Sequence, residues 1–402
     1  MGIYNLERIK SVIYRAEKGE ELTIAFLGGS ITQGSLATEH EYTYAYRVYR
    51  WWCDTFPKAK FNYVNGGIGG TDSYYGVSRA VTDVLMYQPD FVMVDFSVND
   101  TKNEMNRETY EGVIRKLLGW SSHPAVMVLN NIYYDSGVTA QDIHNEVADY
   151  YGVPHVSIRE TVYRRMKAGE YTQDEITPDG LHPNDKGHGL VADEITKLLA
   201  EIIGDVDAEK TSGAKKTAGV NQADEEFSDA ELSSAEFSGA EQASWSVDTY
   251  AARSEEVGLP VPLTANAYED ARRLTIREIC PKLYGFRADT REKMGHLDHF
   301  KNGWIGVNAG DSITFELEGS CIGIQYRKTI SRPAVRAQAV LDGDVEHPVL
   351  LDGNFDEDWG DCLYIQPILH HGEKKTHTLE ITVLDDECAG TTPFYLMSII
   401  VA

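Results

Sequence analysis

The sequence predicts two domains of different fold class, an α/β domain with a parallel sheet and a C-terminal antiparallel β-sandwich. Up to about residue 204, short apolar segments alternate with segments whose apolar residues have helical spacing, which indicates repeated βαβ units. From about residue 245, short segments alternate between apolar and polar residues, with no helical segment between them. This second pattern is typical of antiparallel strands packed as two sheets.

The first domain, residues 1–204, is expected to hold five strands and six helices. The spacing of Leu6, Ile9, Val12 and Ile13 indicates the opening helix, and Gly19 lies where its C-terminal cap is expected. Each strand is a short apolar run, and the helices between the strands would cover both faces of the sheet. The predicted strands are 22–27, 61–64, 91–96, 125–129 and 154–158, and the predicted helices are 5–18, 42–56, 73–88, 107–120, 139–151 and 185–203.

Residues 205–244 are predicted to form an acidic, flexible linker. They contain ten acidic residues and three lysines, with too few apolar side chains to offset the entropy of ordering the chain. The β-sandwich then occupies residues 245–402. Its alternating segments include 312–319, 321–326, 337–341, 378–383 and 395–401, and turn signals separate several of them.

The charge of the chain argues against several classes of partner. Its 402 residues include 63 acidic and 37 basic side chains, which gives a formal net charge of −26 at pH 7. Such a surface repels phosphate groups, so neither nucleic acid nor an anionic membrane is expected as a partner, and neutral sugars fit better. No apolar segment approaches the ~20 residues needed to span a membrane. The sequence is also compatible with a homo-oligomer.

The cysteines and the N-terminus predict a cytoplasmic protein. The N-terminal residues are charged and amphipathic, without the apolar core or the cleavage site of a signal peptide. The cysteines are odd in number and widely spaced, with no C-x-x-C pair, so reduced thiols are expected instead of disulfides or a zinc site. They are Cys53, Cys280, Cys321, Cys362 and Cys388.

Ser30 is the candidate nucleophile. It follows Gly28 and Gly29 at the end of the first predicted strand, where the chain must turn sharply into a helix. A turn of this kind can lift one hydroxyl above the end of a parallel sheet, beside free backbone N–H groups. Taken alone, a serine in a glycine-rich turn is more often just a turn residue. Its interpretation as a nucleophile therefore depends on partners further along the chain.

Asp179 and His182 are the candidate partners of Ser30. They lie three residues apart in a turn that Pro178, Gly180 and Pro183 make rigid. An Asp carboxylate bound to one ring nitrogen of His182 would fix its tautomer, and the other nitrogen could take the proton of Ser30. Serine needs such a base because its hydroxyl is a poor nucleophile near neutral pH.

Three groups could stabilise the negative charge that develops on an attacked carbonyl. They are the backbone N–H of Ser30, the backbone N–H of Gly70 and the side-chain amide of Asn99. Each lies at the carboxyl end of a predicted strand, the edge where ligands bind in parallel sheets. Considered singly, Gly70 also fits a turn glycine, and Asn99 also fits a cap or turn residue.

Together these residues resemble the SGNH/GDSL hydrolases. The resemblance spans about residues 22–203, and the four residues that name the family correspond to Ser30, Gly70, Asn99 and His182, with Asp179 as the acid of the triad. The sequence departs from the family pattern at Gly29, where Asp is frequent, and at Ser97-Val98, where Gly-Gly is frequent. The segments that carry the resemblance are Gly28-Gly29-Ser30-Ile31, residues 65–70, Asn99-Asp100 and residues 179–184.

This resemblance implies a flavodoxin-like three-layer domain that hydrolyses an ester through an acyl-enzyme. In that scheme Ser30 attacks, His182 transfers the proton and Asp179 orients His182. Ser30, Gly70 and Asn99 then form the oxyanion hole. It also implies that the reaction needs no metal and no cofactor.

The C-terminal segment looks like the β-sandwich modules of polysaccharide acetyl esterases, including the mannan-acting enzymes of carbohydrate esterase family 17. Within it, Trp304 and Trp359 are candidates to stack on a sugar ring, although packing in the core suits them equally. The sequence predicts that His370, His371 and His377 are surface residues near a β-turn and not metal ligands, because no further Cys or His follows at metal-binding spacing.

The leading hypothesis is a cytoplasmic esterase that removes acetyl groups from mannan- or xylan-type oligosaccharides derived from plant polysaccharides. A lipase or thioesterase is the alternative within the enzyme class, and it would require an apolar channel for a long acyl chain. The alternative from another class is a carbohydrate-binding protein whose hydrolase domain has lost its catalytic activity.

Overall fold

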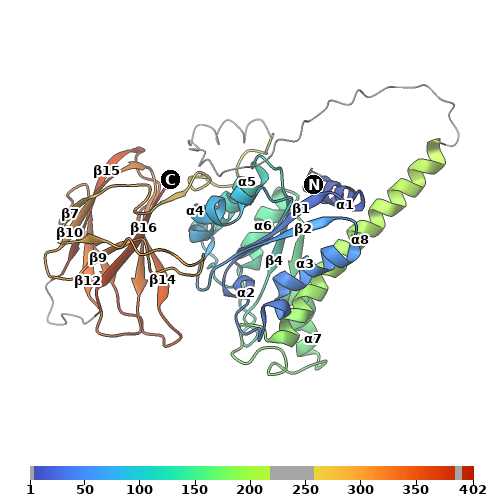
Figure 1. The fold of residues 1–402 in the computed structure, drawn as a ribbon, viewed down its shortest axis with the longest axis horizontal. Helices are drawn as coiled ribbons and strands as arrows, with labels where there is room; N and C mark the ends of the chain where they lie inside the picture. Colours follow the sequence, from blue (N-terminus) through green and yellow to red (C-terminus); the bar gives the residue numbers. More distant parts are fainter. Residues whose placement is uncertain (1–3, 218–257, 385–391) are drawn as a thin grey trace.

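The computed structural model describes residues 4–217, 258–384 and 392–402, and it has the two predicted fold classes (Figure 1). The α/β domain is built on a parallel sheet of five strands in the order β2-β1-β3-β4-β5. The carboxyl ends of these strands therefore lie along one edge of the sheet. The strands are β1 (Glu21–Gly28), β2 (Lys60–Gly67), β3 (Phe91–Asp95), β4 (Ala125–Asn130) and β5 (His155–Ser157).

Helices cover both faces of this sheet. Alternate strand residues point to opposite faces, so Ile24 and Phe26 pack with α1, α3 and α8, whereas Ala25 and Leu27 pack with α4, α5 and α6. Among the described residues, no helix is long and apolar enough to cross a membrane. The helices are α1 (Tyr4–Glu17), α2 (Ser30–Gln33), α3 (Tyr44–Thr55), α4 (Ser73–Asp83), α5 (Glu104–Leu118), α6 (Gln141–Tyr150), α7 (Arg164–Lys167) and α8 (Asp185–Thr217).

The second domain consists of two antiparallel sheets that enclose a separate apolar core. One sheet has the order β13-β12-β15-β10-β7, and the other has the order β14-β11-β16-β9-β8, with β6 paired to β16. The strands are β6 (Arg272–Leu274), β7 (Lys282–Tyr284), β8 (Arg287–Ala288), β9 (Trp304–Gly306), β10 (Ser312–Gly319), β11 (Ile322–Lys328), β12 (Arg336–Leu341), β13 (Val349–Asp352), β14 (Cys362–Leu369), β15 (Lys375–Val383) and β16 (Phe394–Val401).

The segment between the domains differs from the prediction at its start. Helix α8 continues to Thr217, so residues 205–217, which were expected to be flexible linker, are helical. Alanine, lysine and glutamate favour helices, and this local preference extends α8 despite the low apolar content. The rest of the predicted linker and the predicted domain boundary at residue 245 lie outside the described residues.

Residues 258–271, here called the strap, precede the first sandwich strand and lie against α5. Buried charged groups of α5 hold this segment. Glu111 accepts hydrogen bonds from the backbone of Leu263 and Thr264, and Arg115 forms an ion pair of 2.6 Å with Glu269. Lys116, whose pKa burial lowers to about 8, donates to the carbonyl of Ala271 at 2.6 Å.

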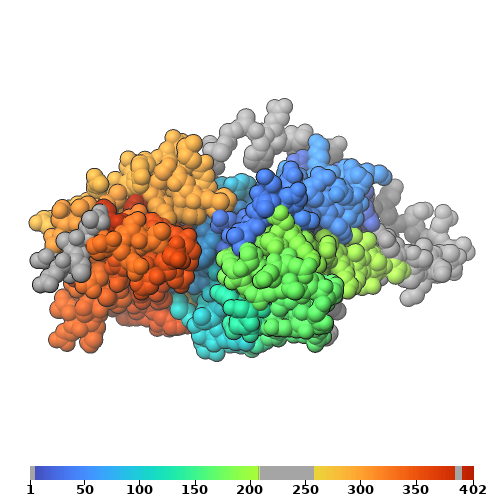
Figure 2. All heavy atoms as spheres, turned by 90° about the horizontal axis from the view of Figure 1, so that it is seen from below, coloured from blue at the N-terminus to red at the C-terminus, as the bar shows by residue number. Residues whose placement is uncertain are grey.

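The sandwich packs directly on the α/β domain (Figure 2). One continuous apolar cluster contains Tyr74 of α4 and Tyr268 of the strap, together with Cys321, Leu363 and Met397 of the sandwich. The sheet that holds β14, β11 and β16 therefore covers the α4–α5 side of the α/β domain.

Candidate active site

Ser30 lies at the carboxyl end of β1, as the first residue of α2. The turn leaves no space for a side chain at Gly28, because a Cβ there would lie 2.2 Å from the Thr32 hydroxyl and 2.5 Å from the Asp95 carbonyl. As the first residue of a helix, Ser30 has a backbone N–H without an intrahelical acceptor. The turn therefore presents a hydroxyl and a free N–H at the same position.

The structure brings Ser30, His182 and Asp179 together as predicted. Ser30 Oγ is 2.8 Å from His182 Nε2, although 152 positions separate the two residues. His182 Nδ1 is 2.7 Å from Asp179 Oδ2. With the Nδ1 proton donated to Asp179, Nε2 is free to accept the proton of the Ser30 hydroxyl. The three side chains thus form a relay that can activate Ser30 as a nucleophile.

The loop that carries Asp179 and His182 fixes the carboxylate. Asp179 Oδ1 accepts hydrogen bonds from the backbone N–H groups of Leu181 at 2.9 Å and His182 at 2.8 Å. Burial alone would raise the pKa of Asp179, but the hydrogen bonds from the His182 ring and from these two N–H groups lower it below its usual value. Asp179 is therefore ionised at neutral pH and oriented toward the imidazole.

The Asn99 side chain and the loop that leads to Gly70 both lie close to the turn that carries Ser30. A Cβ at Gly29 would lie 2.2 Å from the Asn99 side-chain oxygen, and a Cβ at Gly69 would lie 3.7 Å from Ser30 Cβ. The Asn99 amide and the Gly69-Gly70 loop are therefore both near the nucleophile. This geometry explains Gly29, because a side chain at that position would displace Asn99.

Asp100 supports this arrangement, and the sequence analysis assigned it no role. Its carboxylate accepts a hydrogen bond of 2.8 Å from the N–H of Ser73, and its other oxygen is 2.8 Å from His144 Nε2. The His144 ring stacks on Tyr110 with 3.6 Å between ring centroids. Asp100 thereby ties the loop of Asn99 to the first turn of α4, which follows Gly70. No spacing signal in the sequence distinguishes Asp100 from an ordinary loop carboxylate.

Arg79 of α4 holds the ends of two strands together at the same edge of the sheet. Its side chain is fully buried and donates to the carbonyls of Gly28 at 2.8 Å and of Gly66. It also forms an ion pair of 2.8 Å with Asp83. Arg79 thus satisfies carbonyl groups at the ends of β1 and β2 and fixes the turn before Ser30.

Asp95 is a buried carboxyl group directly beneath this turn. Its backbone carbonyl accepts the N–H of Gly29 at 3.2 Å, and its side chain accepts a hydrogen bond of 2.8 Å from Asn131. Burial raises the pKa of Asp95 to about 7, despite hydrogen bonds from Asn131 and Thr32 that act in the opposite direction. The folded protein therefore holds a proton here that the unfolded chain releases near pH 4.

We expect Asp95→Asn to change the pH dependence of stability. Because the folded-state pKa is raised, the proton held by Asp95 favours folding at low pH, and this contribution is lost as the pH rises toward 7. Asparagine carries no such proton. From pH 5 to pH 8 the wild type should lose about 2.6 kcal/mol of unfolding free energy through this group, and the variant should not show this loss. Denaturant unfolding of both proteins at the two pH values measures this difference, and parallel pH profiles would contradict it.

The sandwich contributes Trp359 to the edge of the site. A Cβ on Gly70 would lie 3.3 Å from Trp359 Cη2, so the indole lies against the Gly69-Gly70 loop. The side chain is 55% exposed, and Phe355 packs edge-on against it with 5.0 Å between ring centroids. Trp359, which the sequence predicts as a candidate sugar contact, is thus accessible at the active site.

The prediction that Trp304 could also contact a sugar is wrong. Trp304 is 2% exposed and packs edge-on against Phe315 in the core of the sandwich, with 5.4 Å between ring centroids. Its indole lies in β9 on the inner face of the sheet, where no ligand can reach it. The sequence around Trp304 has no clear alternation of apolar and polar residues, so it could not show that the indole faces the core.

The prediction of surface histidines is confirmed for His370 and His371 and wrong for His377. His377 is 3% exposed and binds Asp342 through Nδ1 at 2.8 Å, so it is not a surface residue. His370 and His371 are exposed, and they are hydrogen-bonded to Tyr268 and Glu108, two residues that precede the sandwich.

Comparisons with known proteins agree with this geometry. Residues 26–190 match the GDSL-like lipase/acylhydrolase family. Over 100% of its length, the chain is similar to the crystal structure of a two-domain esterase active on acetylated mannans, co-crystallised with mannopentaose. Identity is 42%, the TM-score is 0.83, and 95% of that chain is covered. A second crystal structure of a two-domain esterase active on acetylated mannans gives the same identity and TM-score, with 98% of this chain and 95% of that chain covered. No curated protein sequence gives a significant match.

Proposed function

Because the chain belongs to the GDSL-like lipase/acylhydrolase family and is a carboxylic ester hydrolase, we propose that it removes acetyl groups from oligosaccharides derived from plant mannans. The observation that carries the proposal is the relay of 2.8 Å and 2.7 Å from Ser30 through His182 to Asp179, beside an exposed tryptophan of the sandwich. Similarity over the full chain to an esterase active on acetylated mannans supports the same substrate class.

The proposed reaction has two halves. Ser30 Oγ attacks the acetyl carbonyl carbon while His182 Nε2 takes its proton, and the carbonyl oxygen becomes an oxyanion held by the N–H groups of Ser30 and Gly70 and by the Asn99 amide. The C–O bond to the sugar then breaks, and His182 returns the proton to the departing sugar hydroxyl. Water, deprotonated by His182, attacks the acetyl-Ser30 ester, and acetate leaves with Ser30 restored.

Polar groups around Trp359 favour a sugar over a fatty acyl chain. The loop that carries Trp359 also carries the exposed carboxylate of Asp356 and the side chain of Glu357, which accepts a hydrogen bond from the indole N–H. An aromatic face suits a sugar ring when carboxylates beside it can accept hydrogen bonds from the sugar hydroxyl groups. Long acyl chains would instead need an apolar channel, as the lipase or thioesterase alternative requires.

The state of the thiols supports the proposal that the enzyme works in the cytoplasm, on imported fragments. Cys53, Cys280, Cys321 and Cys362 are free, and two of them are buried. Unpaired cysteines are usual in a reducing compartment.

Incubation with acetylated manno-oligosaccharides tests the proposal. Mass spectrometry should show loss of acetyl groups from the sugar together with release of acetate, and acetylated xylo-oligosaccharides serve as the comparison substrate. Faster turnover of the xylo-oligosaccharides would move the assignment to xylan. Hydrolysis restricted to long-chain esters or thioesters would support the lipase or thioesterase alternative, and binding without turnover would support a carbohydrate-binding protein.

We expect Trp359→Ala to weaken oligosaccharide binding without impairing the chemistry. Loss of one stacked aromatic ring is worth roughly 1 kcal/mol, so KM for an acetylated manno-oligosaccharide should rise about fivefold. The kcat/KM for a small chromogenic acetate ester should stay within about twofold, because that substrate is too short to use the ring. Tyr284→Ala is the control, since Tyr284 is an exposed aromatic residue of the other sheet. Equal effects of Trp359→Ala on both substrates would contradict a role in sugar binding.

A further inference from the structure

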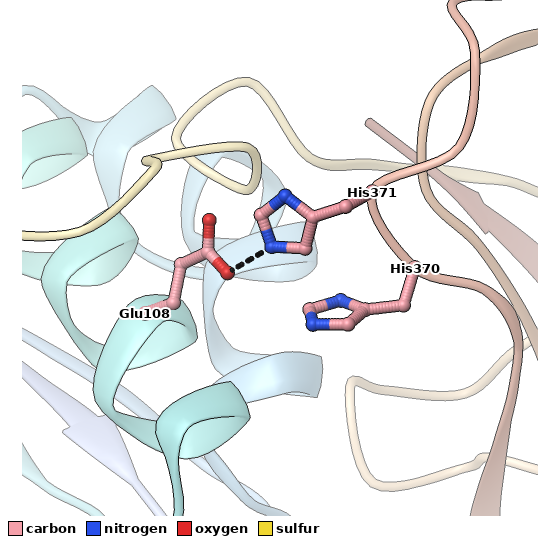
Figure 3. A group of neighbouring side chains, drawn as sticks. All are labelled: Glu108, His370 and His371. Atoms are coloured by element: carbon pink, nitrogen blue, oxygen red, sulfur yellow. Dashed lines mark hydrogen bonds and ion pairs between the residues drawn. The ribbon is translucent and has the colours of Figure 1, made fainter.

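Three side chains with metal-ligating atoms lie where the two domains meet, apart from the catalytic relay. Glu108 projects from α5, and His370 and His371 follow the end of β14. Figure 3 shows the carboxylate and the two imidazole rings turned toward one another across the domain boundary. One ligand atom from each residue lies within 4.8 Å of the other two.

Hydrogen bonds within the protein hold the Glu108 carboxylate in place. The Glu108 side chain is 5% exposed, and its Oε1 accepts a hydrogen bond of 2.8 Å from the N–H of Ala267 in the strap. Its Oε2 is 2.7 Å from His371 Nε2. A buried carboxylate needs compensating partners, and here one oxygen is committed to the backbone while the other faces the imidazoles.

His370 is oriented by a buried neighbour. Its Nδ1 is 2.7 Å from the hydroxyl of Tyr268, a fully buried side chain that also contacts the thiol of Cys321. When Nδ1–H donates to Tyr268, the lone pair of Nε2 is free. Metal-binding histidines are commonly oriented by such a hydrogen bond from the other ring nitrogen.

We propose that Glu108, His370 and His371 bind one divalent zinc-type ion that joins the two domains. Two imidazoles and one carboxylate are a ligand set that zinc accepts, with water in the fourth position. Tetrahedral Zn²⁺ holds its ligand atoms about 3.3 Å apart, since each lies about 2.0 Å from the ion. The 2.7 Å hydrogen bond between Glu108 and His371 would open slightly, and the wider separations of up to 4.8 Å would close. His371 would then carry its proton on Nδ1.

The ion would act on the domain arrangement and not on the reacting atoms. Strand β14 runs between the Trp359 loop and His370, and eight extended residues span roughly 25 Å. The start of β14 therefore lies near the Gly69-Gly70 loop. The histidines that follow its last residue reach Glu108 of the α/β domain. A metal at the second end would hold the whole strand against the α/β domain. This inference does not depend on the proposed reaction.

Metal titration of the full chain, without a histidine tag and after chelator treatment, tests the site. Calorimetry with ZnCl2 should give one ion per chain with a dissociation constant of about 1 µM or tighter. CoCl2 should give the visible absorption of a four-coordinate cobalt ion, and CaCl2 should give no comparable binding because calcium prefers oxygen ligands. Zinc should also raise the midpoint of thermal unfolding.

Glu108→Gln is the informative variant, because glutamine keeps an acceptor for the Ala267 N–H but removes the charged ligand. Its zinc affinity should fall at least tenfold, and the thermal shift with zinc should disappear. His347→Gln is the matched control, since His347 pairs with Asp344 at 3.0 Å on an exposed turn of the sandwich. Equal zinc affinity of the wild type and Glu108→Gln, or no binding tighter than about 100 µM by the wild type, would overturn the proposal.

Discussion

Replacing Ser30 with alanine is expected to lower kcat on an acetyl ester at least about 10⁴-fold. The variant keeps the oxyanion groups and the substrate contacts, but it lacks the atom that forms the acyl-enzyme. Because the substitution removes one oxygen atom, which bonds the His182 side chain, the fold should be unaffected. Steady-state kinetics on a small chromogenic acetate measure the loss, and near-UV circular dichroism checks the tertiary structure.

The same variant distinguishes covalent catalysis from a directly activated water. Rapid quenching of the wild type during turnover should give a protein species heavier by one acetyl group, mapped to the peptide that holds Ser30. The Ser30→Ala protein should give none. Ser35→Ala is the control, because Ser35 lies in the same turn but bonds Ser30 only through its backbone N–H. An acetyl label on another residue, or kcat within tenfold of the wild type, would refute the assignment of the nucleophile.

The sequence was sufficient to predict the α/β fold and the relay for a physical reason. The buried strands of a parallel sheet are continuous apolar runs, so β1 and β3 are recognisable and their carboxyl ends can be located. Ser30 and Asn99 follow those ends within four residues, and the Pro/Gly turn places His182. For each of these residues, the local sequence pattern and the topology of a parallel sheet predict the same position.

Contacts between segments distant in sequence could not be predicted in the same way. Glu111, Arg115 and Lys116 have the spacing of an ordinary charged helix face, yet the strap buries all three from about 150 positions away. Glu108 and His371 are separated by 263 positions and meet only because the sandwich docks on α5. The pattern of residues within one segment does not show which segment of another domain packs against it.

Asp179→Asn should lower kcat about 10³-fold while leaving KM nearly unchanged. The Asn amide would place either an NH₂ group or a neutral oxygen opposite His182 Nδ1, which now lies 2.7 Å from a carboxylate oxygen. An NH₂ there favours the tautomer with the proton on Nε2, which cannot accept the proton of Ser30, and the imidazolium also loses its counter-charge. In a buried triad the corresponding change costs about 10⁴-fold. Here the Asp179 side chain is 44% exposed, so water replaces part of the lost stabilisation.

The experiment separates orientation of His182 from general loop damage. Asp174→Asn is the matched control, because Asp174 is an exposed carboxylate only five positions earlier in the same loop. Kinetics on the small acetate ester should show a loss in kcat for Asp179→Asn and none for Asp174→Asn. The Ser30 hydroxyl should also react more slowly with a serine-directed phosphonate in Asp179→Asn, since that reaction needs the same base. Unchanged phosphonate labelling together with reduced kcat would mean that Asp179 acts after acylation, and the orienting role assigned to it would then be wrong.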